Sequence, residues 1–332
     1  LTINKANNMD ITAVFNSANA LDFNGALVLR GAGWLTIGGP SLSQAAGTAF
    51  ALDTGASSSS KKDLIVTDAF NGKTLTLSSL TGYGALRADW GATGLRTILV
   101  DQATTTSFNG TIAAHDSASD RSIAFRKAGA GALTLAGILS DGPQAPLSVT
   151  VTNGTLVLTA NNTFRGPIVV RTGATLKMQN ANAGTGFTGG NSAMTGSYTV
   201  DAGAKLQGFR NGTAAFGLGA IVLNGGTLAQ EQGNWTWAND LVLNTGTAST
   251  LESQSSNTGT RALKIQGVVS GDGDLTFSDT TGGMGVDTGF IFTGSNTLSG
   301  TVTIPANRKV RVGGVPGSSA DLGAGAGGSL GT

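Results

Sequence analysis

The single histidine of the chain, His115, lies among residue types that hydrolases use for nucleophilic catalysis. The segment AAHDSASD places Asp116, Ser117 and Asp120 beside it. Neighbouring side chains point to different sides of the chain, and a Ser-His-Asp triad is assembled from segments that are distant in sequence. We therefore interpret His115 as a solvated loop residue, and we predict no catalytic residue.

Two carboxylates, Asp272 and Asp274, lie two residues apart in the segment GDGD. This spacing places both side chains on one side of an extended chain, where they could coordinate Ca²⁺ or act as an acid and base pair. Outward, solvated carboxylates at a turn are the simpler interpretation, and we prefer it.

Residues 282–290 resemble one turn of the calcium-binding nonapeptide repeat GGxGxDxUx, in which aspartates coordinate Ca²⁺ between stacked turns. Gly289 stands where the repeat has an aliphatic residue, and no tandem copy follows. An ordinary glycine-rich turn is therefore our interpretation. The sequence predicts no metal ion and no other cofactor.

Two tryptophans, Trp235 and Trp237, share one face of an extended chain in the segment NWTW. A pair of indoles on an exposed sheet could stack on sugar rings, whereas buried indoles would supply apolar area to a core. We favour burial and keep glycan stacking by Trp235 and Trp237 as the alternative.

Composition narrows the classes of partner. Charged residues make up 12% of the chain, and 20 basic residues face 19 acidic ones, so the net charge is +1. No basic stripe is interleaved with aromatic residues, and we expect neither a nucleic acid nor an anionic membrane as partner. The absence of cysteine excludes disulfides and cysteine-based metal sites. No run of about 18 apolar residues could span a membrane as a helix.

The elements that must position any site are short strands. Glycine reaches 52 of 332 residues, yet 39% of the chain is hydrophobic, which is enough for a core. Apolar residues alternate over two or three positions and are bounded by Gly, Asn or Thr, which is typical of strands between sharp turns. No segment has a capped apolar stripe of helical period. Examples of the alternation are residues 133–135, 156–158, 221–223 and 275–277.

A unit of two strands recurs along the chain. Residues 162–178 align without a gap with residues 296–312 at an offset of 134, and residues 23–37 align with them at an offset of 141. Apolar positions coincide, for example Ile168 with Val302, and we expect the two strands of a unit to share one inward face. Repeats that cannot bury a face alone stack in one dimension, so the sequence predicts a β-solenoid with turns of roughly 20 to 25 residues.

A two-sheet sandwich is the competing all-β fold, but it would require antiparallel hairpins between neighbouring strands. The gapless repeats favour stacking. In a solenoid, Asn153, Asn224 and Asn244 at recurrent turns could form amide ladders, and the loop at residues 54–62 would protrude.

The chain resembles the autotransporter-associated β-strand repeat found in passenger regions of Gram-negative autotransporters and related surface proteins. The first third matches more loosely than the rest. The residues that carry the resemblance are KAGAGALTLAG at 127–137, NGTLVLTANNTFRGPIVVRTGATLKM at 153–178, YTVDAGAKLQ at 198–207, LGAIVLNGGTLAQ at 218–230 and FTGSNTLSGTVTIPANRKVRV at 292–312.

The resemblance implies a right-handed parallel β-helix with loop excursions, displayed outside a Gram-negative cell as a stalk or adhesin, and it transfers no catalytic residue. We expect a continuous β-helix over residues 1–312, looser over 1–126, and a Gly/Ala/Ser-rich segment at 313–332 that begins a further turn or a linker. We expect no outer-membrane anchor within residues 1–332, and we expect the native polypeptide to continue beyond Thr332 or its end to meet another subunit.

The sequence therefore predicts a non-catalytic extracellular or cell-surface module. Its expected partners are further copies, joined through the ends or sides of the β-helix into a filament or sheath, and host or matrix glycans or proteins. The alternative is a polysaccharide-binding or polysaccharide-cleaving β-helix. Such sites need clustered acidic and basic residues, and no cluster is visible along the sequence.

Overall fold

The computed structural model describes residues 2–5, 11–14, 20–21, 24–31, 34–38, 43–61, 63–67, 70–88, 93–114, 121–179, 194–208, 216–231, 235–254, 263–279, 289–305, 310–312 and 321–322. These residues form two compact units, Leu1–Pro167 and Ile168–Thr332. They contain strands and turns and no α-helix. Each unit is described separately.

In the first unit the strands form three parallel sheets. The first sheet contains β1 (Thr2–Lys5), β4 (Ala26–Gly31), β7 (Phe50–Asp53), β11 (Thr74–Thr81), β13 (Arg96–Asp101), β16 (Ile123–Ala128) and β19 (Leu147–Val151). The second contains β2 (Ile11–Val14), β5 (Trp34–Gly38), β10 (Asp63–Val66), β12 (Leu86–Ala88), β15 (Ile112–Ala113) and β18 (Leu139–Ser140). The third contains β14 (Thr106–Phe108), β17 (Ala132–Leu135) and β20 (Thr155–Leu158).

Two short pairs complete the first unit. Strands β3 (Ala20–Leu21) and β6 (Ser43–Gln44) pair in parallel. Strands β8 (Gly55–Ser57) and β9 (Ser60–Lys61) pair antiparallel, so the predicted loop at residues 54–62 contains a small hairpin with exposed residues at its tip.

The second unit also has three sheets. The first contains β21 (Ile168–Val170), β23 (Tyr198–Asp201), β25 (Ile221–Asn224), β28 (Leu241–Leu243), β31 (Val269–Gly271) and β34 (Thr297–Leu298). The second contains β22 (Thr175–Met178), β24 (Lys205–Gly208), β26 (Thr227–Gln230), β29 (Ser249–Ser253), β32 (Leu275–Asp279) and β35 (Val302–Thr303). The third contains β27 (Trp235–Trp237), β30 (Leu263–Ile265), β33 (Phe290–Phe292), β36 (Val310–Val312) and the antiparallel β37 (Asp321–Leu322).

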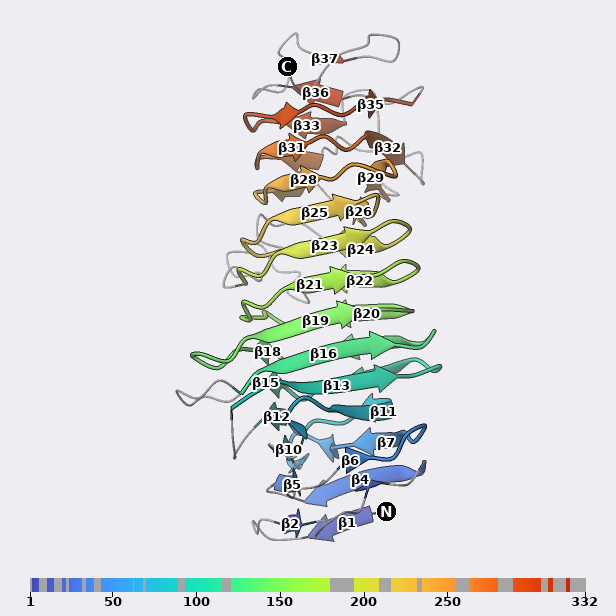
Figure 1. Cartoon of the computed structure of the whole chain (residues 1–332), viewed down its shortest axis with the longest axis vertical. Coiled ribbons are helices and arrows are strands. Elements are labelled where there is room, and N and C mark those ends of the chain that lie inside the picture. Colours follow the sequence, from blue (N-terminus) through green and yellow to red (C-terminus); the bar gives the residue numbers. More distant parts are fainter. Residues whose placement is uncertain are drawn as a thin grey trace. The chain divides into compact units, whose positions relative to one another are not determined.

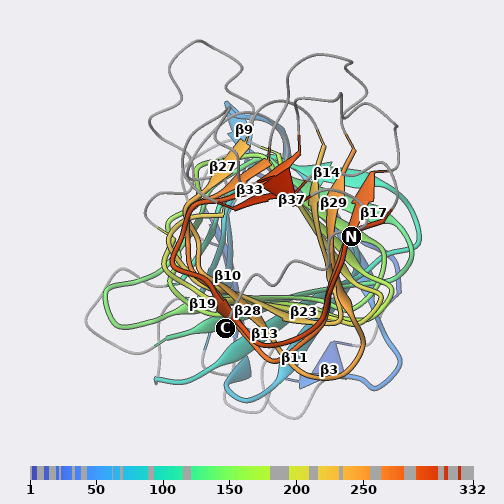
Figure 2. The ribbon, with the colours of Figure 1, turned by 90° about the horizontal axis from the view of Figure 1, so that it is seen from above.

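Each unit is a β-solenoid, which confirms the predicted parallel β-helix. Within a sheet, Arg96 lies opposite Ile123, 27 residues later, and Ile123 opposite Leu147, 24 residues later. Parallel neighbours cannot be joined by a tight hairpin, so the chain completes a turn of the solenoid between them. Figure 1 shows this stacking in chain order for β13, β16 and β19 and separately for β23, β25 and β28. Figure 2 looks along the stacking direction, and the strands of each unit lie along three sides.

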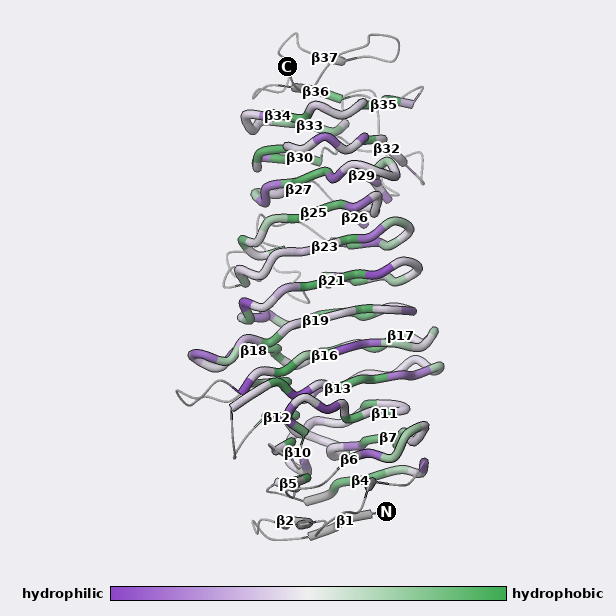
Figure 3. The backbone as a smooth tube through the Cα atoms, viewed as in Figure 1, coloured by the Kyte–Doolittle hydropathy of each residue, from purple (hydrophilic) through white to green (hydrophobic). Residues whose placement is uncertain are grey.

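The core of each unit consists of ladders of apolar side chains at one register position. In the first unit Ile98, Phe125 and Val149 lie opposite one another in successive strands, and each is at most 1% exposed. In the second unit Leu206, Leu228 and Leu251 form such a ladder. Each such side chain stabilises the fold by about 1.5 to 3 kcal/mol. Figure 3 shows hydrophobic residues on strands of each unit, and hydrophilic residues both in turns and on strands such as β16.

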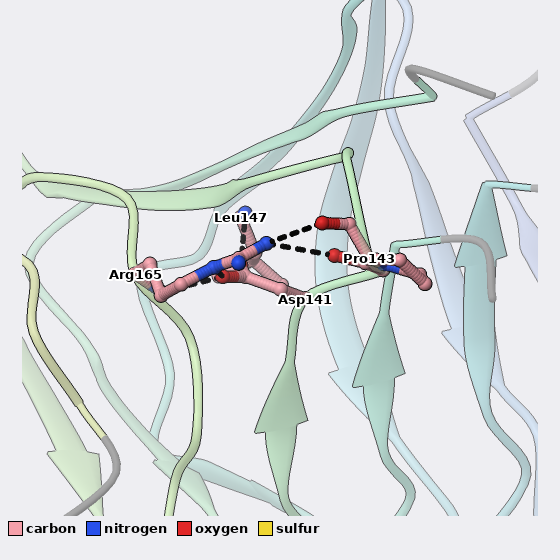
Figure 4. Close-up of polar contacts among 5 residues, drawn as sticks. Asp141, Pro143, Leu147 and Arg165 are labelled. Carbon is pink, nitrogen blue, oxygen red and sulfur yellow. Dashed lines mark hydrogen bonds and ion pairs between the residues drawn. The ribbon is translucent and has the colours of Figure 1, made fainter. Parts of the chain in front are cut away.

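Asp and Asn side chains at the turns bond main-chain N–H groups of the adjacent turn. In Figure 4 the Asp141 carboxylate accepts hydrogen bonds from the N–H groups of Leu147 (2.6 Å) and Arg165 (2.7 Å) and from Nε of Arg165 (2.8 Å). Nη2 of Arg165 donates to the carbonyls of Gly142 and Pro143, both at 3.0 Å. Equivalent bonds run from the N–H groups of Ala49, Ala85, Val268 and Thr301 to Asn24, Asp63, Asp240 and Asp274.

The predicted amide ladder is confirmed at two of three positions. Nδ2 of Asn244 donates to Oδ1 of Asn224 at 2.7 Å, and Nδ2 of Asn224 donates to Oδ1 of Asp201 at 3.2 Å. Asn153 does not join such a ladder; its Oδ1 accepts from the N–H of Gly154 instead. An amide at a turn can bond its own backbone or the next turn, and residue type does not decide between them.

Aligned copies of the repeated two-strand unit do not fall on the same sides of the solenoid. Ile168, in β21 of the first sheet, was aligned with Val302, but Val302 lies in β35 of the second sheet. The two strands of a unit, such as β21 and β22, lie in different sheets of the solenoid, and their aligned apolar residues Ile168, Val170, Leu176 and Met178 are all buried, in agreement with the expected inward face. The alignment detects strand–turn–strand segments, and any two successive sides of the solenoid produce that pattern.

The close approach of successive turns requires glycine at particular corners. A Cβ atom added to Gly110 would lie 2.0 Å from the carbonyl oxygen of Gly84, and one added to Gly137 would lie 2.0 Å from that of Gly110. Real Cβ atoms do not approach so closely, so a larger residue must push two turns apart.

We expect Gly110→Ala to lower the free energy of unfolding by about 2 kcal/mol, because the new methyl group overlaps a main-chain oxygen. Urea denaturation followed by circular dichroism measures this. Gly25→Ala is the matched control, since a Cβ there meets no atom within 4 Å. Equal losses in the two variants would contradict the corner argument.

Candidate functional site

Charged and amide side chains gather on the outer face of the second sheet of the second unit. We call Lys177, Lys205, Gln207, Glu231, Glu252 and Gln254 the outer polar network. Lys177, Lys205, Gln207 and Glu252 come from β22, β24 and β29, and Glu231 and Gln254 directly follow β26 and β29. Lys205 and Gln207 alternate with the inward Leu206, so the strand geometry points them outward.

The network is closed by internal bonds. Nζ of Lys205 lies 2.8 Å from Oε2 of Glu252, and Nζ of Lys177 lies 3.9 Å from Oε2 of Glu231. Nε2 of Gln207 donates to Oε2 of Glu231 at 3.0 Å and to Oε1 of Gln254 at 2.6 Å. Nε2 of Gln254 donates to Oε1 of Glu252 at 2.5 Å. Two ammonium groups thus balance two carboxylates.

The bonds cross an intervening strand. Ala229 of β26 lies opposite Gln207 on one side and Glu252 on the other. The pairs Lys205–Glu252 and Gln207–Gln254 both join the strands that flank β26, so they pass over the small side chain of Ala229. Ala229 is 0% exposed although it stands at an outward position, and the Glu252 side chain is only 7% exposed. The network therefore joins successive turns of the solenoid through bonds on its outer surface.

The chemistry of the network follows from this pairing. Carboxylates, amides and ammonium groups could bind hydroxyl-rich or charged ligands, but a ligand would have to replace bonds that the network already makes. No group of three or more His, Cys, Asp or Glu residues that could hold a metal ion occurs among the described residues. The arrangement is best suited to holding turns in register.

Of the two tryptophans singled out from the sequence, Trp235 and Trp237, the structure describes the side chain of Trp237. Trp237 is 2% exposed, and its ring lies 5.6 Å from that of Phe216, which in turn lies 5.9 Å from the ring of Tyr198. This burial agrees with the favoured interpretation, in which Trp237 packs in the core, and it leaves the Trp237 indole no exposed face for a sugar. The side chain of Trp235 lies outside the described residues, so glycan stacking at Trp235 stays a prediction.

The other residues singled out from the sequence do not form a site in the described part of the chain. Asp274 is exposed, and its Oδ1 accepts from the N–H of Thr301 at 2.8 Å, a stacking role. Asp272 is exposed at the turn. His115, Asp116, Ser117 and Asp120, like residues 282–288 of the nonapeptide-like segment, lie outside the described residues.

Sequence reasoning missed the outer polar network because its members are far apart in the chain. Lys205 and Glu252 are separated by 47 residues, which is two turns of the solenoid, through Thr227 or Ala229 of β26. The available signal was an outward position occupied by Lys, Gln or Glu in successive strands. This pattern can be recognised only when the register between successive strands is known.

No protein-family model, curated protein or solved structure matches the chain. The resemblance to the autotransporter-associated repeat therefore stays a prediction. Among the described residues no helix is long and apolar enough to cross a membrane.

We expect Glu252→Ala to lower the free energy of unfolding by about 2 kcal/mol, because it leaves Lys205 and Gln254 without their bonds to a nearly buried carboxylate. Lys205→Ala combined with Glu252→Ala should cost less than the sum of the two single changes. Chemical denaturation of the four proteins gives the coupling. Asp272→Ala, which removes an exposed carboxylate in the same unit, should change stability by under about 0.5 kcal/mol. Additive effects would show that the network contributes no coupling.

The hydroxyl of Tyr198 is buried without a hydrogen-bond partner, and burial raises the pKa of Tyr198 well above its ordinary value of 10.0. The folded state therefore keeps a proton that the unfolded state loses, so Tyr198 reduces stability as the pH rises above about 10. We expect Tyr198→Phe to flatten this loss by up to about 1.4 kcal/mol per pH unit. Denaturation between pH 9 and pH 11 tests it, with Tyr83→Phe at the surface as control. Identical pH profiles for the two variants would contradict the assignment.

Proposed function

We propose that the chain is a non-catalytic structural or adhesive module of the cell exterior, a section of a β-helical stalk that can assemble through its ends or sides. The observation that carries the proposal is the use of polar side chains for stacking. The outer polar network, the ladder through Asn224 and the bonds of Arg165 to the Asp141 carboxylate all join neighbouring turns. The resemblance to a repeat of Gram-negative surface proteins, described above, supplies the expected location.

Low charge and the absence of cysteine are compatible with export, because oxidation outside the cell would have nothing to cross-link. A stack of short strands also separates its two ends by a distance that grows with each turn, since neighbouring strands lie about 4.8 Å apart. Such a module suits the spacing or presentation of loops.

The location is tested with antibodies raised against the purified protein. They should label intact cells of the producing organism, and external protease should remove the label. Labelling that requires permeabilised cells would contradict display at the surface. Electron microscopy of the purified protein tests assembly separately: filaments or sheets support it, and dispersed short particles at high concentration count against it.

A polysaccharide-binding or polysaccharide-cleaving activity is the second candidate, favoured by one observation. The outer polar network supplies the clustered Lys and Glu residues that the linear sequence does not reveal. The test is incubation of the protein with a broad panel of glycans. If the structural proposal is right, no new reducing ends and no unsaturated products form. Turnover that is lost in Glu252→Gln and kept in Asp272→Asn would establish the second candidate and overturn the first.

A further inference from the structure

The turn between β19 and β20 holds an asparagine in contact with the peptide nitrogen that follows it. Asn153 is exposed, and Gly154 has a φ of 66°. The N–H of Gly154 donates to Oδ1 of Asn153 at 2.8 Å. Because Oδ1 is bonded to Cγ, this hydrogen bond also keeps the Gly154 nitrogen near the carboxamide carbon, the atom that it would attack.

A lysine from the preceding turn acts on the same peptide group. Nζ of Lys127 donates to the main-chain oxygen of Asn153 at 3.4 Å, to that of Gly129 at 2.8 Å and to that of Ala128. Lys127 is 0% exposed. A cationic donor on the Asn153 carbonyl withdraws electron density from the Asn153–Gly154 peptide, which makes its N–H more acidic. Loss of that proton must precede attack by the nitrogen.

Three other Asn-Gly pairs of the described residues, those that begin at Asn24, Asn71 and Asn224, lack this combination. The Asn24 carboxamide oxygen accepts from the N–H of Ala49 at 2.9 Å. The N–H of Gly72, after Asn71, donates to the carbonyl of Leu95 at 2.8 Å. The N–H of Gly225 donates to Oγ of Ser249 at 3.2 Å, and the preceding Asn224 belongs to the amide ladder. In each pair either the nucleophile or the carboxamide is held by another group.

We propose that Asn153 is a site of spontaneous covalent modification, in which the turn converts its own carboxamide to a carboxylate through a cyclic imide. Solvent base removes the Gly154 amide proton, and the nitrogen forms a bond to Cγ of Asn153. The Cγ–Nδ2 bond breaks, and ammonia leaves. Water then opens either carbonyl of the imide, which gives aspartate or, with the main chain rerouted through Cγ, isoaspartate.

The modification would change the turn in two ways. A carboxylate would appear close to Lys127, whose pKa is lowered by burial and raised in part by Asp101, so the new charge would favour the ammonium form. Isoaspartate would also add one methylene group to the main chain directly before β20, where Thr155 and Leu156 pair with Ala132 and Leu133. Gly154 has no room to adapt, since a Cβ there would lie 2.4 Å from the oxygen of Gly129.

Ageing of the purified protein at mildly alkaline pH tests the proposal. Peptide mapping by mass spectrometry should find the gain of about one dalton at Asn153 at least about tenfold faster than at Asn24, Asn71 and Asn224, because in those three pairs another group holds the carboxamide or the nucleophilic nitrogen. The same protein in denaturant is the reference, and there the four sites should react at similar rates. Similar rates at the four sites in the folded protein would overturn the proposal.

Two variants separate the contributions. Asn153→Gln should remain unmodified at this position, because the larger ring forms slowly. Lys127→Met should slow the reaction at Asn153 several-fold and leave Asn24, Asn71 and Asn224 unchanged. If the loss of Lys127 merely loosened the fold, the rates at those other sites would move toward their values in denaturant. An unchanged rate at Asn153 would overturn the activating role of Lys127.

Discussion

Hydrogen bonding between parallel strands of successive turns, at a fixed register, is the constraint on which the rest of each unit depends. Each strand of the parallel sheets has its partner one turn away along the chain, so these strands are paired only after the chain has completed a turn. The register places identical kinds of side chain above one another, which builds the apolar ladders inside. It also places main chains in contact at the corners, where glycine is required between Gly84, Gly110 and Gly137.

The same constraint determines what polar residues do. A turn leaves main-chain N–H groups without strand partners, and buried unpaired groups are costly. Asp141, Asp240 and Asp274 meet this need by accepting from main-chain N–H groups of the adjacent turn. On the outer face of the second unit, the Lys205–Glu252 pair bridges two turns across Ala229. Residue types that form active sites in enzymes here hold turns together, which is why we favour a structural function.

Stacking also shapes reactivity. A turn that bonds its own backbone, as Asn153 does with Gly154, keeps a nucleophile and an electrophile together for the lifetime of the fold. A turn whose groups bond the next turn, as at Asn224, keeps them occupied. The choice between local and inter-turn bonding therefore affects both the stability of a corner and its chemical durability, and we expect covalent ageing first where the bonding is local.

The sequence by itself determined the short strands, because alternation of apolar residues and the glycine turns are local signals. The recurrence of a strand–turn–strand segment then predicted that these strands stack as a solenoid. The sequence also identified Asn224 and Asn244 as ladder residues. It did not locate the outer polar network or the sheet to which Val302 belongs. Those depend on how many residues each turn contains, and paired residues are separated by 20 between Ile221 and Leu241 but by 28 between Leu241 and Val269. Only the tertiary structure shows how many residues each turn contains, and this number determines which side chains meet.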